Sequence, residues 1–145
     1  MSEAAPPFSH SDEVRFSDLD VNGHLNNVAF LEFLESARVA YIGRIYPQGD
    51  PWRTSFGILI AETKISYRSP GHFGERIETT LRPDTLGRTS FRTDFEMHVG
   101  ERLIADGYSV QVIYDRGERR PTPIPPALRE RLAADGARDR PPAPS

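Results

Sequence analysis

The chain has no cysteine, which excludes disulfides, thiolate metal ligands and a cysteine nucleophile. Lysine is nearly absent as well, since Lys64 is the only one among 18 basic residues. The formal net charge is −3 and no basic run stands out, so the sequence does not indicate a nucleic-acid partner. The lack of cysteine also suits an intracellular protein.

No stretch is apolar enough to span a membrane. The longest candidate, from Val28 to Tyr46, is interrupted by four charged residues, Glu32, Glu35, Arg38 and Arg44. The first residues have neither the basic start nor the apolar centre of a secretory signal. We therefore expect a cytoplasmic protein with no membrane partner.

What is present is the composition of an ordinary globular protein. Hydrophobic residues make up 37% and charged residues 27% of 145 residues, enough to bury a core. Proline, small residues and charge dominate both ends, which is typical of flexible tails. We expect one domain over residues 13–136, between tails at 1–12 and 137–145.

A helical pattern runs from Asn26 or Asn27 to about Ile45. Polar residues gather on one side and apolar residues cover most of the rest, which predicts a helix buried on several sides. The proline and glycine of PQGDPW, residues 47–52, end it.

Strand patterns flank this helix. One precedes it at 13–17, and four follow at 57–69, 75–83, 89–99 and 102–115. Their connectors are short, which favours antiparallel neighbours. A small surface helix is predicted at 125–136. The fold class is therefore α+β, a long central helix packed against a curved antiparallel sheet of about five strands. Such a sheet leaves edges that usually pair with another copy.

The most polar segment, SDLDVNGHLNN, lies directly before the helix. Asp18, Asp20, Asn22 and Gly23 match the start of an EF-hand calcium loop. The twelfth position, which should be glutamate, is Ala29, and the preceding segment is strand-like rather than helical. Calcium binding is therefore not predicted.

Two other chemistries also lack support. The four histidines show no paired helical spacing, and Asp20 with His24 alone cannot complete a zinc site. Ser109 follows Gly107 by two residues as in a hydrolase nucleophile turn, but Gln111 replaces the second glycine. No metal or other cofactor is predicted.

Two interpretations of the polar segment remain. In the first, its Asp, Asn and Gly residues only form a turn and cap the helix. In the second, unpaired amides at 26–28 and the helix dipole polarise a carbonyl oxygen. Asp20 then acts as base or nucleophile, His24 passes a proton and Asn22 orients it. Such a site would open an activated acyl group.

The helix itself offers a substrate surface next to these groups. The Val28 amide and the Phe30 side chain lie at its start, and further apolar side chains follow along it: Phe33, Leu34 and Tyr41. We expect this row to form a wall for an acyl or aryl chain and to favour medium or longer apolar acyl groups.

The motif Asp-x-Asp-Val-x-Gly-His-Leu-Asn-Asn, followed by LEFLESAR, resembles the hotdog-fold acyl thioesterases. The nearest branches are the 4-hydroxybenzoyl-CoA thioesterase-like enzymes and the acyl-ACP thioesterases. The resemblance covers residues 14–114, and the later segments ISYRSPGHFGERIE and LGRTSFRTDFE agree with it. It implies a hotdog fold, a homodimer or homotetramer, and hydrolysis of an acyl-CoA or acyl-ACP to the free acid and thiol.

The resemblance also implies roles for single residues. Asp20 rather than Asp18 corresponds to the catalytic carboxylate, and Asn22 and His24 fit an arrangement of the acyl-ACP branch. The Asn27 amide corresponds to the donor that polarises the carbonyl. The carrier-binding segment, contributed by a neighbouring subunit, corresponds to Arg88, Thr89 and Ser90.

Two alternatives share this fold. One is an acyl-thioester binder or sensor that does not turn over its ligand, because a fold does not fix a function. The other is a hotdog dehydratase, whose histidine would lie elsewhere on the central helix; none of the four histidines here falls within that helix.

Overall fold

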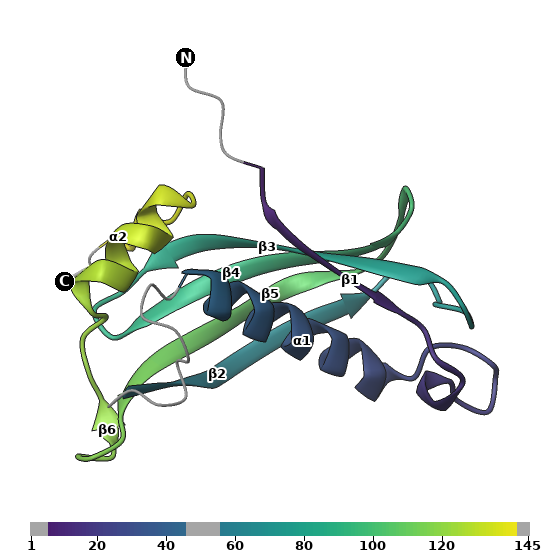
Figure 1. Ribbon diagram of the computed structural model, residues 1–145, viewed down its shortest axis with the longest axis horizontal. Helices are drawn as coiled ribbons and strands as arrows, with labels where there is room; N and C mark the ends of the chain where they lie inside the picture. Colours follow the sequence, from purple (N-terminus) through teal and green to yellow (C-terminus); the bar gives the residue numbers. More distant parts are fainter. Residues whose placement is uncertain (1–5, 46–55, 142–145) are drawn as a thin grey trace.

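A long helix lies against a curved seven-stranded sheet in the computed structural model, which describes residues 6–45 and 56–141 (Figure 1). The main strands follow the order β1-β3-β4-β5-β2, with β6 beside β5 and β7 beside β3. The elements are β1 (Phe8–Glu13), a 3-10 turn (Phe16–Asp18), α1 (Asn27–Ile45), β2 (Phe56–Tyr67), β3 (Arg76–Leu86), β4 (Ser90–Val99), β5 (Arg102–Asp115), β6 (Arg120–Pro121), α2 (Pro126–Ala134) and β7 (Arg138–Asp139).

The predicted architecture is confirmed, with two small additions. Neighbouring strands of the main path are antiparallel, as the short connectors indicated. The additions are the two-residue strands β6 and β7, and β7 runs parallel to β3. The break predicted at PQGDPW lies outside the described residues.

The first strand and both tail boundaries differ from the prediction. The strand expected at 13–17 is β1, which pairs with β3 from Phe8 opposite Leu81 to Glu13 opposite Arg76. Residues 8–12 thus belong to the sheet although they were assigned to the tail. The sequence of β1, FSHSDE, contains one large apolar residue. The strand is therefore held mainly by backbone pairing, which a hydrophobic pattern does not reveal.

The C-terminal boundary differs for a similar reason. Arg138 pairs with Thr85 of β3, so residues assigned to the second tail extend the fold. The helix α2 was expected on the surface, but Leu128 and Leu132 are buried against the rest of the molecule. Gly136 follows its end in a left-handed conformation, as predicted for a helix stop.

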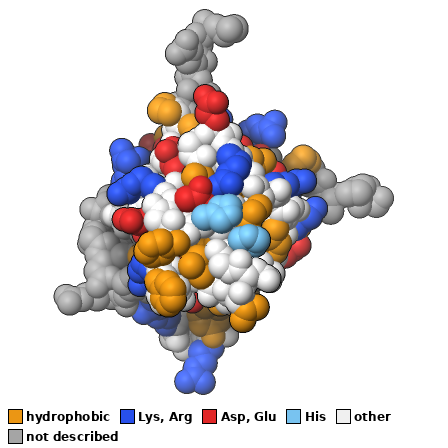
Figure 2. Space-filling view, turned by 90° about the vertical axis from the view of Figure 1, so that its right-hand side faces the viewer, with side chains coloured by type: hydrophobic (Ala, Val, Ile, Leu, Met, Phe, Trp, Pro, Cys, Tyr) orange, Lys and Arg blue, Asp and Glu red, His pale blue; other side chains and the backbone are white. Residues whose placement is uncertain are grey.

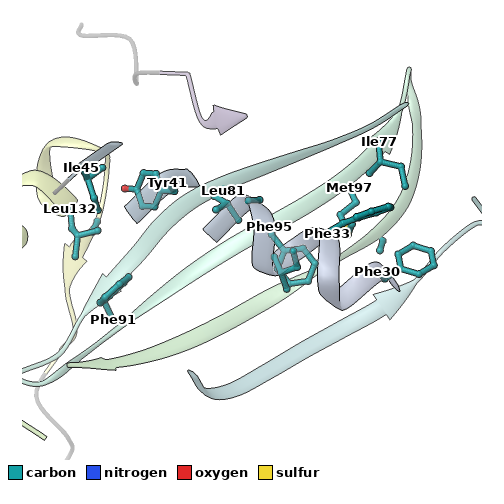
Figure 3. Close-up of a cluster of buried hydrophobic side chains, with 14 of the residues drawn as sticks. Phe30, Phe33, Tyr41, Ile45, Ile77, Leu81, Phe91, Phe95, Met97 and Leu132 are labelled. Carbon is teal, nitrogen blue, oxygen red and sulfur yellow. The ribbon is translucent and has the colours of Figure 1, made fainter. Parts of the chain in front are cut away.

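The core lies between one face of α1 and the sheet (Figure 3). Phe30, Phe33, Leu34 and Tyr41 are each at most 6% exposed. They pack with inward side chains of the sheet that include Ile77, Leu81, Phe91, Phe95 and Met97. The expectation that this row forms an acyl wall is therefore wrong for Phe30, Phe33 and Leu34, which are buried in the core.

The opposite side of α1 is less covered than predicted. The helix contacts β1 and β3, whereas Val28, Leu31 and Val39 are each more than 40% exposed. The helix is buried along one face and not on several sides, so it carries an open apolar surface of its own. Within residues 6–45 and 56–141, no helix is long and apolar enough to cross a bilayer.

Candidate active site

The loop from Asp20 to His24 is a tight turn fixed at both ends. Leu19 and Leu25 form an isolated bridge, and the Asp20 amide donates to the His24 carbonyl at 2.8 Å. Gly23 has a φ of 75°, which side chains other than glycine rarely adopt. The turn therefore presents the Asp20 side chain on the surface directly before α1.

One oxygen of Asp20 is anchored and the other is available. Oδ1 accepts hydrogen bonds from the backbone amides of Asn22 at 2.8 Å and His24 at 3.1 Å. Oδ2 has no hydrogen-bond partner among the described residues. This arrangement fixes the direction of an exposed carboxylate while leaving one oxygen free to meet a substrate or a water.

Asp18 has a different environment. It is 4% exposed and accepts hydrogen bonds from the Arg15 amide, Nε and Nη2 at 2.8, 3.2 and 3.0 Å. The hydrogen bond from the Arg15 side chain lowers the pKa of Asp18, against the opposing effect of burial. Its backbone oxygen also accepts from the Asn26 amide at 2.8 Å. Asp18 is thus a structural anchor, and the assignment of Asp20 as the reactive carboxylate stays a prediction.

The start of α1 offers fewer free donors than predicted. The Asn26 amide is bound to Asp18, and the Val28 amide donates to Asn26 Oδ1 at 2.8 Å, an ordinary helix cap. The Asn27 amide alone of these three has no partner among the described residues. The prediction of a free Val28 amide is therefore wrong. The Phe30 side chain is 2% exposed and packs in the core beneath the helix start.

Two predicted side chains do not meet as expected. Asn22 and His24 are both exposed, and in the described part of the chain no hydrogen bond joins their side chains. The His24 ring instead stands edge-on to the His72 ring, with centroids 5.3 Å apart. Figure 2 shows histidine side chains touching on this face, beside an exposed apolar patch. Phe16 and Phe73, which are 80% and 64% exposed, lie at this end of the molecule.

His72 is held by a small polar network that the sequence analysis missed. Its amide donates to Glu75 Oε1 at 2.6 Å, and Arg102 Nη2 donates to Glu75 Oε2 at 2.7 Å. Burial would raise the pKa of Glu75, but these donors outweigh it and hold that pKa below its usual range. The network fixes His72 against His24, about fifty positions away in the chain. The segment ISYRSPGHFGERIE, which includes His72, was the available signal.

Tyr67, at the end of β2, was also missed. Its ring packs edge-on against Phe30 at 5.1 Å, and its hydroxyl lies 3.5 Å from the Asn27 carbonyl oxygen. At 44% exposure, Tyr67 borders the start of α1 and can contact a group bound there.

The segment Arg88–Ser90 does not join this site within one chain. It comprises the end of the turn between β3 and β4 and the first residue of β4, beside α2, whereas the Asp20 loop is at the other end of the sheet (Figure 1). The ten residue steps of β3 separate the two ends by about 33 Å. Arg88 instead borders a shallow cavity with Arg129 and Arg140.

An apolar cavity lies between α1 and β2. Its lining includes Val39 and Ile42 of α1 and Phe56, Ile58 and Ile60 of β2. Of the row predicted as an acyl wall, Tyr41 lines this cavity, whereas Phe30, Phe33 and Leu34 do not. In the described part of the chain, no group of three or more His, Cys, Asp or Glu side chains is placed to hold a metal ion.

Comparison with known proteins gives consistent matches over most of the chain. The family model described as "Thioesterase-like superfamily" matches residues 14–132. A 1,4-dihydroxy-2-naphthoyl-CoA hydrolase of Synechococcus elongatus is 27% identical over 125 residues, which cover 82% of this chain and 90% of the relative. A long-chain acyl-CoA thioesterase of Escherichia coli is 27% identical, covering 83% of this chain and 92% of its own.

A solved structure gives a closer sequence match. A thioesterase of Thermus thermophilus, solved with coenzyme A and zinc, is 35% identical to this chain. It superposes with a TM-score of 0.78 over 90% of this chain and 96% of its own.

Proposed function

This chain belongs to the thioesterase-like superfamily, and from that premise we propose that it hydrolyses acyl-CoA thioesters to the free acid and thiol. Its fold is the hotdog fold. The observation that carries the proposal is the Asp20 carboxylate, with one oxygen held by two amides and the other free. It precedes a helix whose first amide, that of Asn27, is unpaired within the described residues.

We propose a mechanism in which the Asn27 amide and the positive end of α1 stabilise the oxyanion at the thioester carbonyl. Asp20 Oδ2 takes a proton from a water molecule as the water oxygen attacks the carbonyl carbon. The carbon–sulfur bond then breaks and the thiolate leaves, taking up a proton. The alternative, in which Asp20 attacks and forms an anhydride that water opens, uses the same two groups. His24 is beside this carboxylate and is the proposed proton donor to the thiolate.

We propose an apolar acyl group of medium or greater length, or an aryl group. The relatives named above act on an aryl and on long-chain acyl-CoAs, and the α1–β2 cavity is largely apolar. Each buried methylene contributes about 0.8 kcal/mol, so longer chains should be favoured until the cavity ends. Acyl-ACP is the alternative carrier for the same chemistry.

We also propose a homodimer. Leu59 and Ile60 are 50% and 40% exposed on β2, at the end of the main strand order. An exposed apolar edge favours pairing with a second copy. A second copy is also the source from which Arg88 could reach a carrier bound at Asp20, since the distance within one chain is too long.

The test is turnover of an acyl-CoA panel, followed with a thiol reagent. We expect steady thiol release from octanoyl-, hexadecanoyl- and benzoyl-CoA, with malonyl- and succinyl-CoA poor because a free carboxylate would lose its hydration. Hexadecanoyl-ACP at the same concentration tests the alternative carrier. Tight binding of these thioesters without thiol release would identify the protein as a binder and overturn the proposal.

A further inference from the structure

The α1–β2 cavity is largely apolar, but its lining includes three charged residues, Glu35, Arg38 and Arg116. Arg38 lines the cavity with Val39, Ile42, Ile58 and Ile60, and its side chain is only 12% exposed. Burial lowers the pKa of Arg38, which reflects the cost of removing its guanidinium from water. A buried guanidinium needs hydrogen-bond acceptors to offset its desolvation, whereas a hydrophobic side chain at this position would carry no desolvation penalty.

The partners present use only part of the guanidinium. Nη1 donates to Ser109 Oγ at 3.3 Å, and Nη2 donates to the Glu35 carboxylate. A guanidinium has five N–H groups, and the described residues provide no further acceptor for the others. Arg38 therefore keeps donors available toward the cavity.

A buried polar strip extends beneath Arg38 on the sheet. Ser109, Gln111 and Thr93 are each at most 3% exposed, although apolar side chains surround them. Ser109 Oγ also lies 3.3 Å from Thr63 Oγ1, and Thr93 Oγ1 is hydrogen-bonded to the Gln111 side chain at 3.2 Å. Arg38 thus contacts this strip through Ser109, whose cross-strand neighbour Thr93 lines the cavity together with Gln111.

One side of α1 leads from the proposed reaction centre toward Arg38. Val28, Leu31, Glu35 and Arg38 are spaced by three or four residues, so they follow one side of α1. Val28 and Leu31 are 60% and 41% exposed, which makes the first part of this path apolar and open. Arg38 is eleven residues after Asn27, about 16 Å along the helix.

We propose that Arg38 is a specificity-determining residue that binds a hydroxyl group at the distal end of a long acyl chain, with Ser109 as its neighbour. The proposal rests on the proposed thioesterase function and names the substrate class. A hydroxyl fits this place because it can accept from the Arg38 guanidinium and at the same time donate to the Glu35 carboxylate. The hydroxyl of a short hydroxyaryl acyl group bound at Asp20 of the same chain could not reach Arg38, which is about 16 Å away along the helix.

The experiment compares matched substrate pairs. One pair is hexadecanoyl-CoA and 16-hydroxyhexadecanoyl-CoA, and the control pair is octanoyl-CoA and 8-hydroxyoctanoyl-CoA, which is too short to reach. We expect kcat/KM to favour the hydroxylated member at least tenfold in the long pair and not in the short pair, because only the long pair satisfies the guanidinium.

Three variants test the residue. Arg38→Gln should abolish the preference, and Ser109→Ala should reduce it even if Arg38→Gln folds poorly. Arg44→Gln removes another arginine of α1, one that lies over the Phe8 ring away from the cavity, and should retain the preference. Equal rates for the long pair, or a preference that persists in Arg38→Gln, would overturn the proposal.

Binding separates this proposal from the proposed function. Dissociation constants of non-hydrolysable thioether analogues of the four compounds, measured by calorimetry, should show the same tenfold preference. A preference in affinity without hydrolysis would reject the thioesterase function and keep the role of Arg38. Hydrolysis without any preference for the hydroxylated substrate would keep the thioesterase function and reject the role of Arg38.

Discussion

Asp18 and Asp20 are two positions apart, yet only Asp20 presents a free oxygen. Asp20→Asn keeps the shape of the side chain and the acceptor for the Asn22 and His24 amides. We expect the variant to fold normally, by circular dichroism, and to lose at least a hundredfold in kcat, because an amide cannot take the proton. Asp18→Asn should retain most of the activity per folded molecule. Similar kcat values for the two variants would mean that Asp20 is not the reactive group.

Asp18 should instead make stability depend on pH. Its pKa in the folded protein is lowered chiefly by the Arg15 side-chain hydrogen bond, so it stabilises the fold above the ordinary pKa of Asp. That contribution is lost as the pH falls through the lowered value. We expect Asp18→Asn to cost about 1–3 kcal/mol at pH 7 and progressively less below about pH 4.

Urea unfolding at pH 7, 5 and 3 measures this difference. Asp139→Asn is the control, since that carboxylate is 84% exposed and its ion pair should contribute little. A penalty for Asp18→Asn that stays constant down to pH 3 would contradict the assignment.

Among the elements, those with strong patterns could be predicted from the sequence, and those held by backbone pairing could not. The helix α1 is a long, largely apolar segment and the strand β4 alternates clearly, and both were predicted within one or two residues. The strand β1 is mostly polar and was misplaced, and β7 is too short to leave a pattern. In the site, Asp20 stood out because its motif is contiguous. His72 and Tyr67 come from segments far along the chain, so their positions depend on tertiary packing.

The pairing of β2 with β5 depends on one glycine. A Cβ at Gly107 would lie 1.8 Å from the Lys64 carbonyl oxygen, so any side chain must push the two strands apart. We expect Gly107→Ala to lower the free energy of unfolding by about 3 kcal/mol or more. Gly43→Ala, on an exposed turn of α1 with nothing within 4 Å, should raise it by about 0.5–1 kcal/mol. Equal stability of the two variants in urea would refute the role of Gly107.

At the scale of the whole molecule, the exposed edge of β2 predicts self-association. Multi-angle light scattering at micromolar concentration should give twice the 16.3 kDa of one chain, or four times that mass. Replacing Ile60 with lysine should shift the population toward single chains, since a charge on an edge opposes pairing. A fully active protein of 16.3 kDa would rule the assembly out.

The separation of Arg88 from Asp20 predicts that two inactive variants can complement each other in mixed dimers. If each reaction centre combines Asp20 of one chain with Arg88 of another, Asp20→Asn and Arg88→Gln disable different halves of the same centre. When the two variants are refolded together, some dimers contain one chain of each. In such a mixed dimer one centre carries both substitutions and the other centre carries neither. Mixing the two inactive variants should therefore restore activity. If each centre lay within a single chain, mixing would restore none.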